Sequence, residues 1–191
     1  MKKRPQEIQP PYWLFVLAAT PIFFINFLLP SYPITPTELA IAAFIDNHLF
    51  GQVGFWSSQF PFSSKVTANY LACIGPVFAI LAFYKTYQTM RIDPKQYENY
   101  SLLKYALIPP LAALYILLFL FMFYLTSTNL ASNSQKYSFY GSYALSFSLF
   151  SSSMLIIFYI TPLIVHRCFI YLPALLLENW RDKRSQIRPP K

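Results

Sequence analysis

SSKVTANYLACIGPVFAILAFYK, residues 63–85, is the stretch that decides the fold of this chain. Residues 66–84, 19 positions in all, carry no formal charge, and Lys65 and Lys85 bracket them. A helix rises about 1.5 Å per residue, so this run is long enough to cross the hydrocarbon core of a bilayer. We therefore predict a transmembrane helix at 66–84.

Small residues follow one side of this helix. They alternate at spacings of four and three positions, which is the spacing of a single helix face, and they are Ala68, Ala72, Gly75, Ala79 and Ala82. In lipid, apolar side chains gain little by contacting one another, and small residues let two helix backbones approach closely. We predict that this face packs on another helix, either within the chain or in a partner.

The composition of the whole chain is typical of a polytopic membrane protein. Of its 191 residues, 55% are hydrophobic and 12% are charged, whereas a soluble domain carries about 25% charged residues. A formal net charge of +8 would suit a nucleic-acid-binding protein, but the basic residues flank the apolar runs. We therefore expect a single membrane domain over residues 1–191 and no nucleic-acid partner.

Four apolar runs predict four crossings, at 13–29, 66–84, 105–125 and 142–165. The first follows a basic start, as in a signal peptide. It is longer than the usual apolar core of about 7–15 residues, and no small-residue cleavage site follows it, so we expect it to be retained. In the third run, Pro109-Pro110 suggests that the regular helix begins there, because proline is favoured at helix starts.

The segments outside the crossings have their own patterns. Thr35-Pro36-Thr37-Glu38 matches a capping box with proline at the first helical position, and predicts a helix at 36–50 on the outer (periplasmic) membrane surface. The basic C-terminal segment, 168–191, either continues the fourth helix or forms an interfacial helix. Both alternatives remain open from the sequence.

The distribution of lysine and arginine predicts the orientation. Of the 15 such residues, 13 lie before the first crossing, between the second and third, or after the fourth. The positive-inside rule places these segments in the cytoplasm. The expected fold is an all-α membrane protein, a four-helix transmembrane bundle with both termini cytoplasmic.

Enzymatic patterns are not found in the sequence. His48 and His166 fall on opposite sides of the predicted membrane, and neither has a Cys, His or carboxylate at the spacing of a metal site. No phosphate-binding loop, G-x-S-x-G or H-E-x-x-H pattern occurs. Every Asp and Glu lies outside the predicted crossings, which argues against ion-coupled transport. We therefore expect no catalytic residue, cofactor or metal.

Hydroxyl side chains are frequent in the fourth apolar run. Ala144, Ser148 and Ser152 recur every four residues, and such groups form hydrogen bonds between membrane helices worth about 0.6–2 kcal/mol each. Internal packing is one interpretation of this face and of the small residues of the second helix. The other is contact with a partner's helix, whose candidate residues are Ala68, Ala72, Gly75, Ala79, Ala82, Ala144, Ser148 and Ser152.

Short stretches recur in an order that is known from one protein family. They are Tyr32-Pro33-Ile34-Thr35-Pro36, Pro76-Val77-Phe78-Ala79, Ser101-Leu102-Leu103 before Ile108-Pro109-Pro110-Leu111, and the serine and aromatic run that ends in Thr161-Pro162. This layout, from about Pro30 to Val165, resembles the immunity proteins that protect bacteria against pore-forming colicins, the colicin A immunity-like group. The basic extension after Arg167 departs from that pattern.

The resemblance implies a protein of the bacterial inner membrane that has no cofactor. Such a protein binds the pore-forming domain of its cognate colicin or bacteriocin within the lipid bilayer and prevents the pore from opening. The same helix faces also allow pairing with a second copy of the chain. The alternative interpretation is a non-catalytic structural subunit of a larger inner-membrane complex, such as a secretion or envelope assembly.

Overall fold

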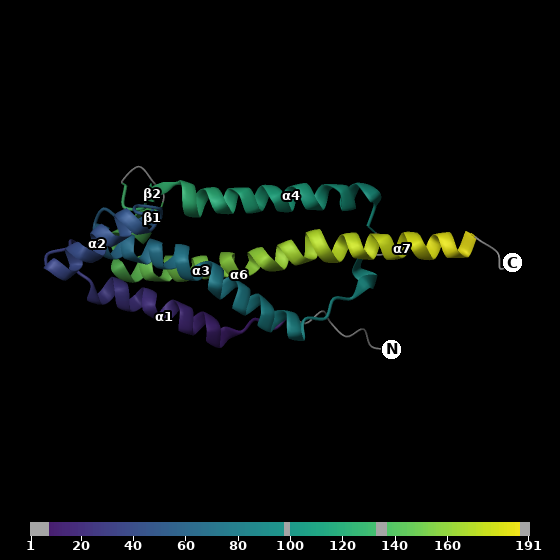
Figure 1. Cartoon of the computed structure of the whole chain (residues 1–191), viewed down its shortest axis with the longest axis horizontal. Helices are drawn as coiled ribbons and strands as arrows, with labels where there is room; N and C mark the ends of the chain where they lie inside the picture. Colours follow the sequence, from purple (N-terminus) through teal and green to yellow (C-terminus); the bar gives the residue numbers. More distant parts are fainter. Residues whose placement is uncertain (1–7, 98–99, 133–136, 188–191) are drawn as a thin grey trace.

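The structure, a computed structural model, describes residues 8–97, 100–132 and 137–187, and it is predominantly helical (Figure 1). The long helices run side by side and reverse direction from one to the next. They are α1 (Tyr12–Leu28), α3 (Pro61–Thr89), α4 (Leu102–Leu120) and α6 (Ala144–Val165). The all-α class predicted from the sequence is confirmed.

Three helical segments are long and apolar enough to cross a membrane: Pro61–Thr89, Leu103–Leu125 and Ala144–Glu178. Helix α1 is also apolar, but its 17 residues are at the lower limit of the roughly 17–25 that span a bilayer. The chain thus has three candidate membrane spans, and a fourth crossing through α1 stays a prediction.

Two helices differ from the predicted boundaries in an informative way. Helix α3 extends five residues beyond the range 66–84 at each end. Helix α4 begins at Leu102 and continues through Pro109 and Pro110, so the prediction that the regular helix starts at these prolines is wrong. Ser101 supplies the helix start instead, because its side chain accepts a hydrogen bond from the Lys104 amide.

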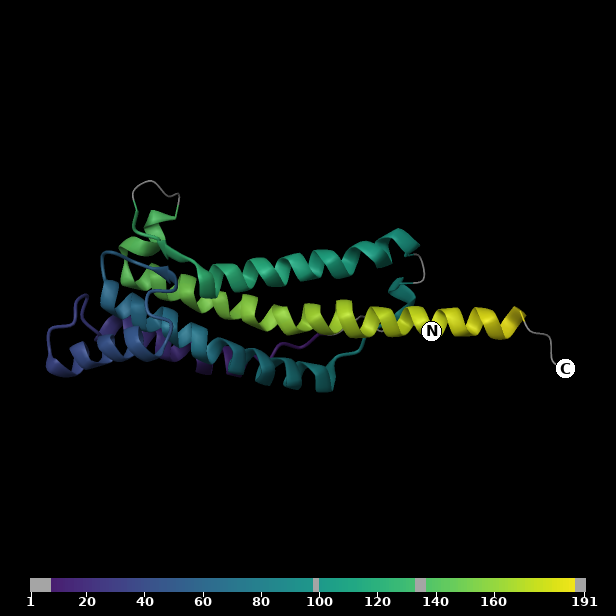
Figure 2. The same cartoon turned by 45° about the horizontal axis from the view of Figure 1, so that its top comes forward.

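The C-terminal segment continues the last long helix. A π-helical segment, η3 (His166–Tyr171), follows α6 directly, and α7 (Leu172–Ile187) carries on in the same direction. Figure 2 shows this continuous helix extending past the other helices. A second π-helical segment, η2 (Phe121–Leu125), prolongs α4. The described part of the basic tail is therefore a continuation of the fourth predicted helix, which was one of the two alternatives.

The connections at one end of the bundle fold into a small unit, which we call the loop cap. It comprises α2 (Pro36–His48), the strands β1 (Gly54–Trp56) and β2 (Ser127–Asn129), α5 (Ser138–Ser142) and residues 49–53, 57–60 and 130–132 beside them. The two strands pair in parallel, with Gly54 opposite Ser127. At the other end, a short helix, η1 (Pro94–Tyr97), lies between α3 and α4.

The predicted capping box is present at the start of α2. The Thr35 hydroxyl accepts a hydrogen bond from the Glu38 amide at 3.3 Å, and the Glu38 carboxylate accepts from the amides of Thr35 and Ile34 at 2.9 and 2.8 Å. Both backbone donors favour the ionised carboxylate, so they lower the pKa of Glu38 below its usual value.

We expect Glu38→Gln to loosen the start of α2 at neutral pH and to have little effect in acid. Because its folded-state pKa is lowered, the carboxylate stabilises the fold above its unfolded pKa of about 4.3, and this contribution is lost as the pH falls through the folded-state value. Amide hydrogen exchange at Ile34 and Thr35 should be faster in the variant than in the parent chain at pH 7. An equally large difference at pH 3 would contradict the assignment.

Candidate functional site

Helices α1, α3 and α6 form the tightly packed part of the bundle. Phe15 of α1 contributes to this core, with its ring edge-on to Phe78 of α3 at 4.9 Å and to Tyr159 of α6 at 5.3 Å between ring centroids. The buried residues of this core include Leu14, Ala18, Ile22, Leu71, Phe78, Leu155 and Phe158. All three helices thus share one apolar core.

The five small residues of α3 are buried, and Ala79 and Ala82 belong to this core. Gly75 is buried, and the exposed fractions of the four alanines are at most 7%: Ala68, Ala72, Ala79 and Ala82. Gly75 lies so close to α6 that a Cβ atom added to it would be 2.6 Å from the ring of Phe158. The small face is therefore occupied by helices of the same chain, which is one of the two alternatives that the sequence left open.

The predicted residues of α6 are placed less uniformly. Ser148 is fully buried, whereas Ala144 and Ser152 are half-buried. The Ser148 hydroxyl donates to the Ala144 carbonyl of its own helix at 2.8 Å. The physical reason is that a serine hydroxyl in a helix reaches the carbonyl one turn earlier. The Ser152 hydroxyl oxygen is buried without a hydrogen-bond partner.

Tyrosine side chains make hydrogen bonds between helices that the apolar and small-residue patterns of the sequence do not indicate. The Tyr70 hydroxyl of α3 donates to the Ala18 carbonyl of α1 at 2.9 Å. Tyr159 of α6 and Thr86 of α3 share a hydrogen bond, also at 2.9 Å. A tyrosine has the length to reach past its own helix, so its presence within an apolar run was the signal that could have found these contacts.

A third tyrosine satisfies a carbonyl that a proline leaves free. Pro76 has no amide hydrogen, so the carbonyl of Ala72, four residues earlier, has no donor within α3. The Tyr124 hydroxyl from η2 donates to this carbonyl at 2.9 Å. Leaving a buried carbonyl unpaired costs about 1–3 kcal/mol. The bond therefore stabilises the proline turn and attaches the end of α4 to α3.

We expect Tyr124→Phe to lower the free energy of unfolding by about 1 kcal/mol, since the Ala72 carbonyl loses its donor while the ring is kept. Tyr115→Phe is a matched control. The Tyr115 hydroxyl is 3.5 Å from the Thr161 hydroxyl, at the outer limit for a hydrogen bond, so its loss should have a smaller effect. Unfolding of both variants in detergent micelles measures the difference, and equal losses would contradict the role of Tyr124.

Helix α4 packs more loosely than α3. In the most apolar 18-residue stretch of each helix, 17% of the α4 stretch is buried, against 50% of the α3 stretch. An apolar groove of about 330 Å³ opens between them, which we call the α3–α4 groove. Its walls come from α3, α4 with η2, and α6, and include Pro76, Ala79, Ile80, Phe119, Tyr124, Phe158, Thr161 and Pro162. Ala79 is the predicted contact residue that lines this groove.

Side-chain bonds to backbone hold the loop cap together. The Asn69 side chain of α3 accepts from the Phe50 amide at 3.1 Å and donates to the Gly51 carbonyl at 2.7 Å. The Ser57 hydroxyl donates to the carbonyl of Gly141 in α5. These bonds join segments that are distant in sequence, so the loop cap fixes how the helices are spaced at this end.

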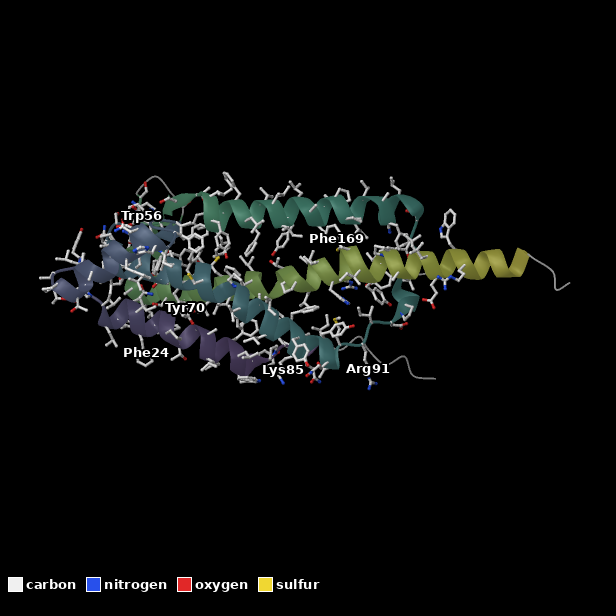
Figure 3. All side chains as sticks on the ribbon, in the orientation of Figure 1. Phe24, Trp56, Tyr70, Lys85, Arg91 and Phe169 are labelled. Atoms are coloured by element: carbon white, nitrogen blue, oxygen red, sulfur yellow. The ribbon has the colours of Figure 1, made fainter. Side chains whose placement is uncertain are left out.

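Basic side chains lie mainly at the end of the molecule opposite the loop cap. Figure 3 shows Lys85 and Arg91 near the end of α3, far from Trp56 of the loop cap. Lys65 is at the loop-cap end, where it forms an ion pair with Asp46. The basic residues of 1–7 and 188–191, together with Lys136, lie outside the described residues.

The titratable side chains are not arranged as a metal site. Over residues 8–97, 100–132 and 137–187, no group of three or more His, Cys, Asp or Glu side chains could hold a metal ion. His166 packs instead against the rings of Phe83 and Tyr87, at 5.7 and 5.1 Å between centroids.

Comparison with known proteins finds no matching family model, no matching curated protein and no matching solved structure. The function is therefore inferred from the residues of this chain and their geometry.

Proposed function

We propose that the chain is a four-crossing protein of the bacterial inner membrane with both termini in the cytoplasm. Helices α1, α3, α4 and α6 supply the crossings, and the 17 residues of α1 rise about 26 Å, a length that a bilayer accommodates by slight thinning. Two observations support this topology. The helices reverse direction in turn, and the described basic side chains lie mainly at the end that would face the cytoplasm.

Its function, in this proposal, is immunity: the chain binds the pore-forming domain of a cognate colicin or bacteriocin in the membrane and prevents the pore from opening. The observation that carries the proposal is the α3–α4 groove, which is apolar and lies between membrane-length helices. Pro76 and Thr161-Pro162, which belong to the layout shared with the immunity proteins, line this groove. A helix of the toxin would place apolar side chains there and meet the Thr161 hydroxyl.

The energy that this requires is modest. If the open and closed states of the toxin were equally populated, reducing the open state to about 1% would need roughly 2.7 kcal/mol of preference for the closed state. Individual polar contacts between membrane helices contribute about 0.6–2 kcal/mol, so a few contacts suffice. Confinement of both partners to one bilayer also raises their effective concentration.

The direct test is expression of the full chain in a sensitive bacterial strain, followed by challenge with a panel of pore-forming colicins and related bacteriocins. We expect survival against one toxin and killing by the others. Equal killing by every member of a broad panel would contradict the proposal. A structural subunit of an envelope complex would give that result, and deleting its gene would disturb the complex in the source bacterium.

We expect Ile80→Trp to remove protection without unfolding the protein, because the larger side chain fills the α3–α4 groove from its open side. Val16→Trp is the matched control: Val16 lies on α1 and its exposed fraction is 66%, against 67% for Ile80. The toxin dose that kills half the cells should fall at least about tenfold for Ile80→Trp, which corresponds to about 1.4 kcal/mol of binding. If both variants protect equally, toxin recognition lies elsewhere.

A further inference from the structure

A second apolar groove lies at the end of the bundle opposite the loop cap. It has a volume of about 380 Å³ and is lined by Tyr105 and Ala106 of α4 and by Leu176, Leu177 and Trp180 of α7. Figure 2 shows α7 passing along the first turns of α4 and continuing beyond them. Because Tyr105 is only two positions into the candidate span Leu103–Leu125, this α4–α7 groove is at the level of a membrane–water boundary.

Cationic residues are next in sequence to residues that line the α4–α7 groove. Lys104 directly precedes Tyr105, is exposed, and has its ammonium group 5.4 Å from the centre of the Tyr100 ring. Arg181 is also exposed, and it follows Leu177 by four residues, so both lie on one side of α7. Glu178 is the acidic side chain described beside them. The described residues beside the groove lining thus add cations and a carboxylate to an apolar surface.

The sequence also concentrates the net charge of the chain in three segments. The segments before α1, between α3 and α4, and after α6 contain 11 basic and five acidic residues, and Lys85 of α3 and Lys104 of α4 bring the basic residues to 13, which accounts for the whole net charge of +8. A molecule that suits the groove would have an apolar part against the groove lining and a negatively charged group beside the basic residues. A second copy of the chain would bring the same positive charge to the contact.

We propose that the α4–α7 groove binds an anionic phospholipid of the cytoplasmic leaflet. An acyl chain lies against Ala106, Leu176 and Leu177, and the phosphate lies between Lys104 and Arg181, with Trp180 at the headgroup level. This site rests on the membrane orientation of the proposed function and does not depend on toxin binding. Lipid binding and protection against a toxin can therefore fail separately.

Fluorescence of Trp180 tests the site. In a full-length chain with Trp13→Phe and Trp56→Phe, Trp180 is the remaining tryptophan, and its exposed fraction of 56% leaves it open to quenching. The protein is reconstituted in nanodiscs of zwitterionic lipid, and brominated phosphatidylglycerol or brominated phosphatidylcholine is added in small steps. We expect the anionic lipid to quench Trp180 at a lower mole fraction than the zwitterionic lipid.

Charge variants then locate the preference. The variants are Lys104→Gln, Arg181→Gln and their combination. Each removed cation should weaken the preference for the anionic lipid about fivefold, because a basic residue near a charged bilayer contributes about 1 kcal/mol to the attraction. Glu178→Gln should strengthen it. The combined variant Lys85→Gln/Arg91→Gln removes two cations from the end of α3, away from the groove, and should leave the preference unchanged.

Native mass spectrometry of the unsubstituted chain repeats the comparison without the tryptophan changes, and retention of phosphatidylglycerol over phosphatidylcholine supports the site. Equal quenching by both lipids would overturn the proposal. The proposal would also be overturned if Lys85→Gln/Arg91→Gln lost as much preference for the anionic lipid as Lys104→Gln/Arg181→Gln. That result would mean that any cation at this end attracts anionic lipid. Protection of Trp180 from both quenchers, with chemical cross-linking of two chains through α7, would identify a second copy as the occupant and would also overturn it.

Discussion

Replacing Gly75 with leucine is expected to separate α3 from α6 and to abolish protection against the toxin. A Cβ atom at this position would lie 2.6–2.8 Å from three ring carbons of Phe158, closer than non-bonded carbons approach. The Phe158 ring is 2% exposed and packs against Phe119 and Phe123 at 4.9 Å between centroids, so moving it aside would disturb these ring contacts. Adding one or a few methylene groups to a packed core lowers the free energy of unfolding by about 1–3 kcal/mol. A whole leucine side chain should lower it by more than that.

A graded series distinguishes this packing from a general effect of substitution. Gly75→Ala adds one methyl group and also gains about 1 kcal/mol of helix propensity, so a net loss of stability would show that the clash with Phe158 outweighs the propensity. Phe158→Leu in the same chain should restore part of the loss, which a double-mutant cycle measures as an interaction energy. Ile80→Leu, on the exposed side of α3, is the control. If Gly75→Leu unfolds at the same denaturant concentration as this control, the close approach of α3 and α6 is wrong.

The features that the sequence predicts well are those set by local chemistry. The candidate spans follow from the length of the apolar runs, and the start of α2 follows from hydrogen bonds among Ile34, Thr35 and Glu38. A small-residue face, by contrast, has the same pattern whether its partner is another chain or α6. The spacing of Ala68 to Ala82 therefore predicts close packing and cannot choose between the two.

The remaining differences arise from contacts between distant segments. The strands β1 and β2 are three residues each, too short for any alternation of side chains to be detected, and they form because the loop cap brings Gly54 beside Ser127. The Tyr124 bond depends on a carbonyl freed by Pro76 on a different helix. The two grooves depend on how far α4 lies from α3 and α7, a spacing that no single helix encodes.

Replacing Gly141 with alanine is expected to disrupt the loop cap while leaving the packing of α1, α3 and α6 in place. A Cβ atom at Gly141 would overlap the backbone of Leu130 and Ala131, and backbone cannot turn away as a side-chain end can. Leu130 is 2% exposed and packs in a separate apolar cluster with Phe60 and Phe147, so moving its backbone away from Gly141 would disturb this cluster. We expect a loss of at least about 2 kcal/mol in the local stability of the loop cap.

Amide hydrogen exchange resolves this local effect. The Leu130 amide donates to the Trp56 carbonyl at 2.9 Å and the Gly54 amide to the Thr126 carbonyl at 2.7 Å, and both should exchange faster in Gly141→Ala. Ser142→Ala, at the next and exposed position, is the matched control and should leave both rates unchanged. If both variants exchange alike, the contact between α5 and the backbone after β2 is wrong.

The same substitution connects the loop cap to the proposed function. Because β2 follows η2 after a single residue, loss of the loop cap releases the end of α4 that Tyr124 ties to α3, and the α3–α4 groove loses its fixed width. Gly141→Ala should therefore insert into the membrane at normal levels and yet protect less well than Ser142→Ala in the toxin challenge. Full protection by a Gly141→Ala chain with accelerated exchange in the loop cap would mean that toxin binding needs neither the loop cap nor the groove that it holds open.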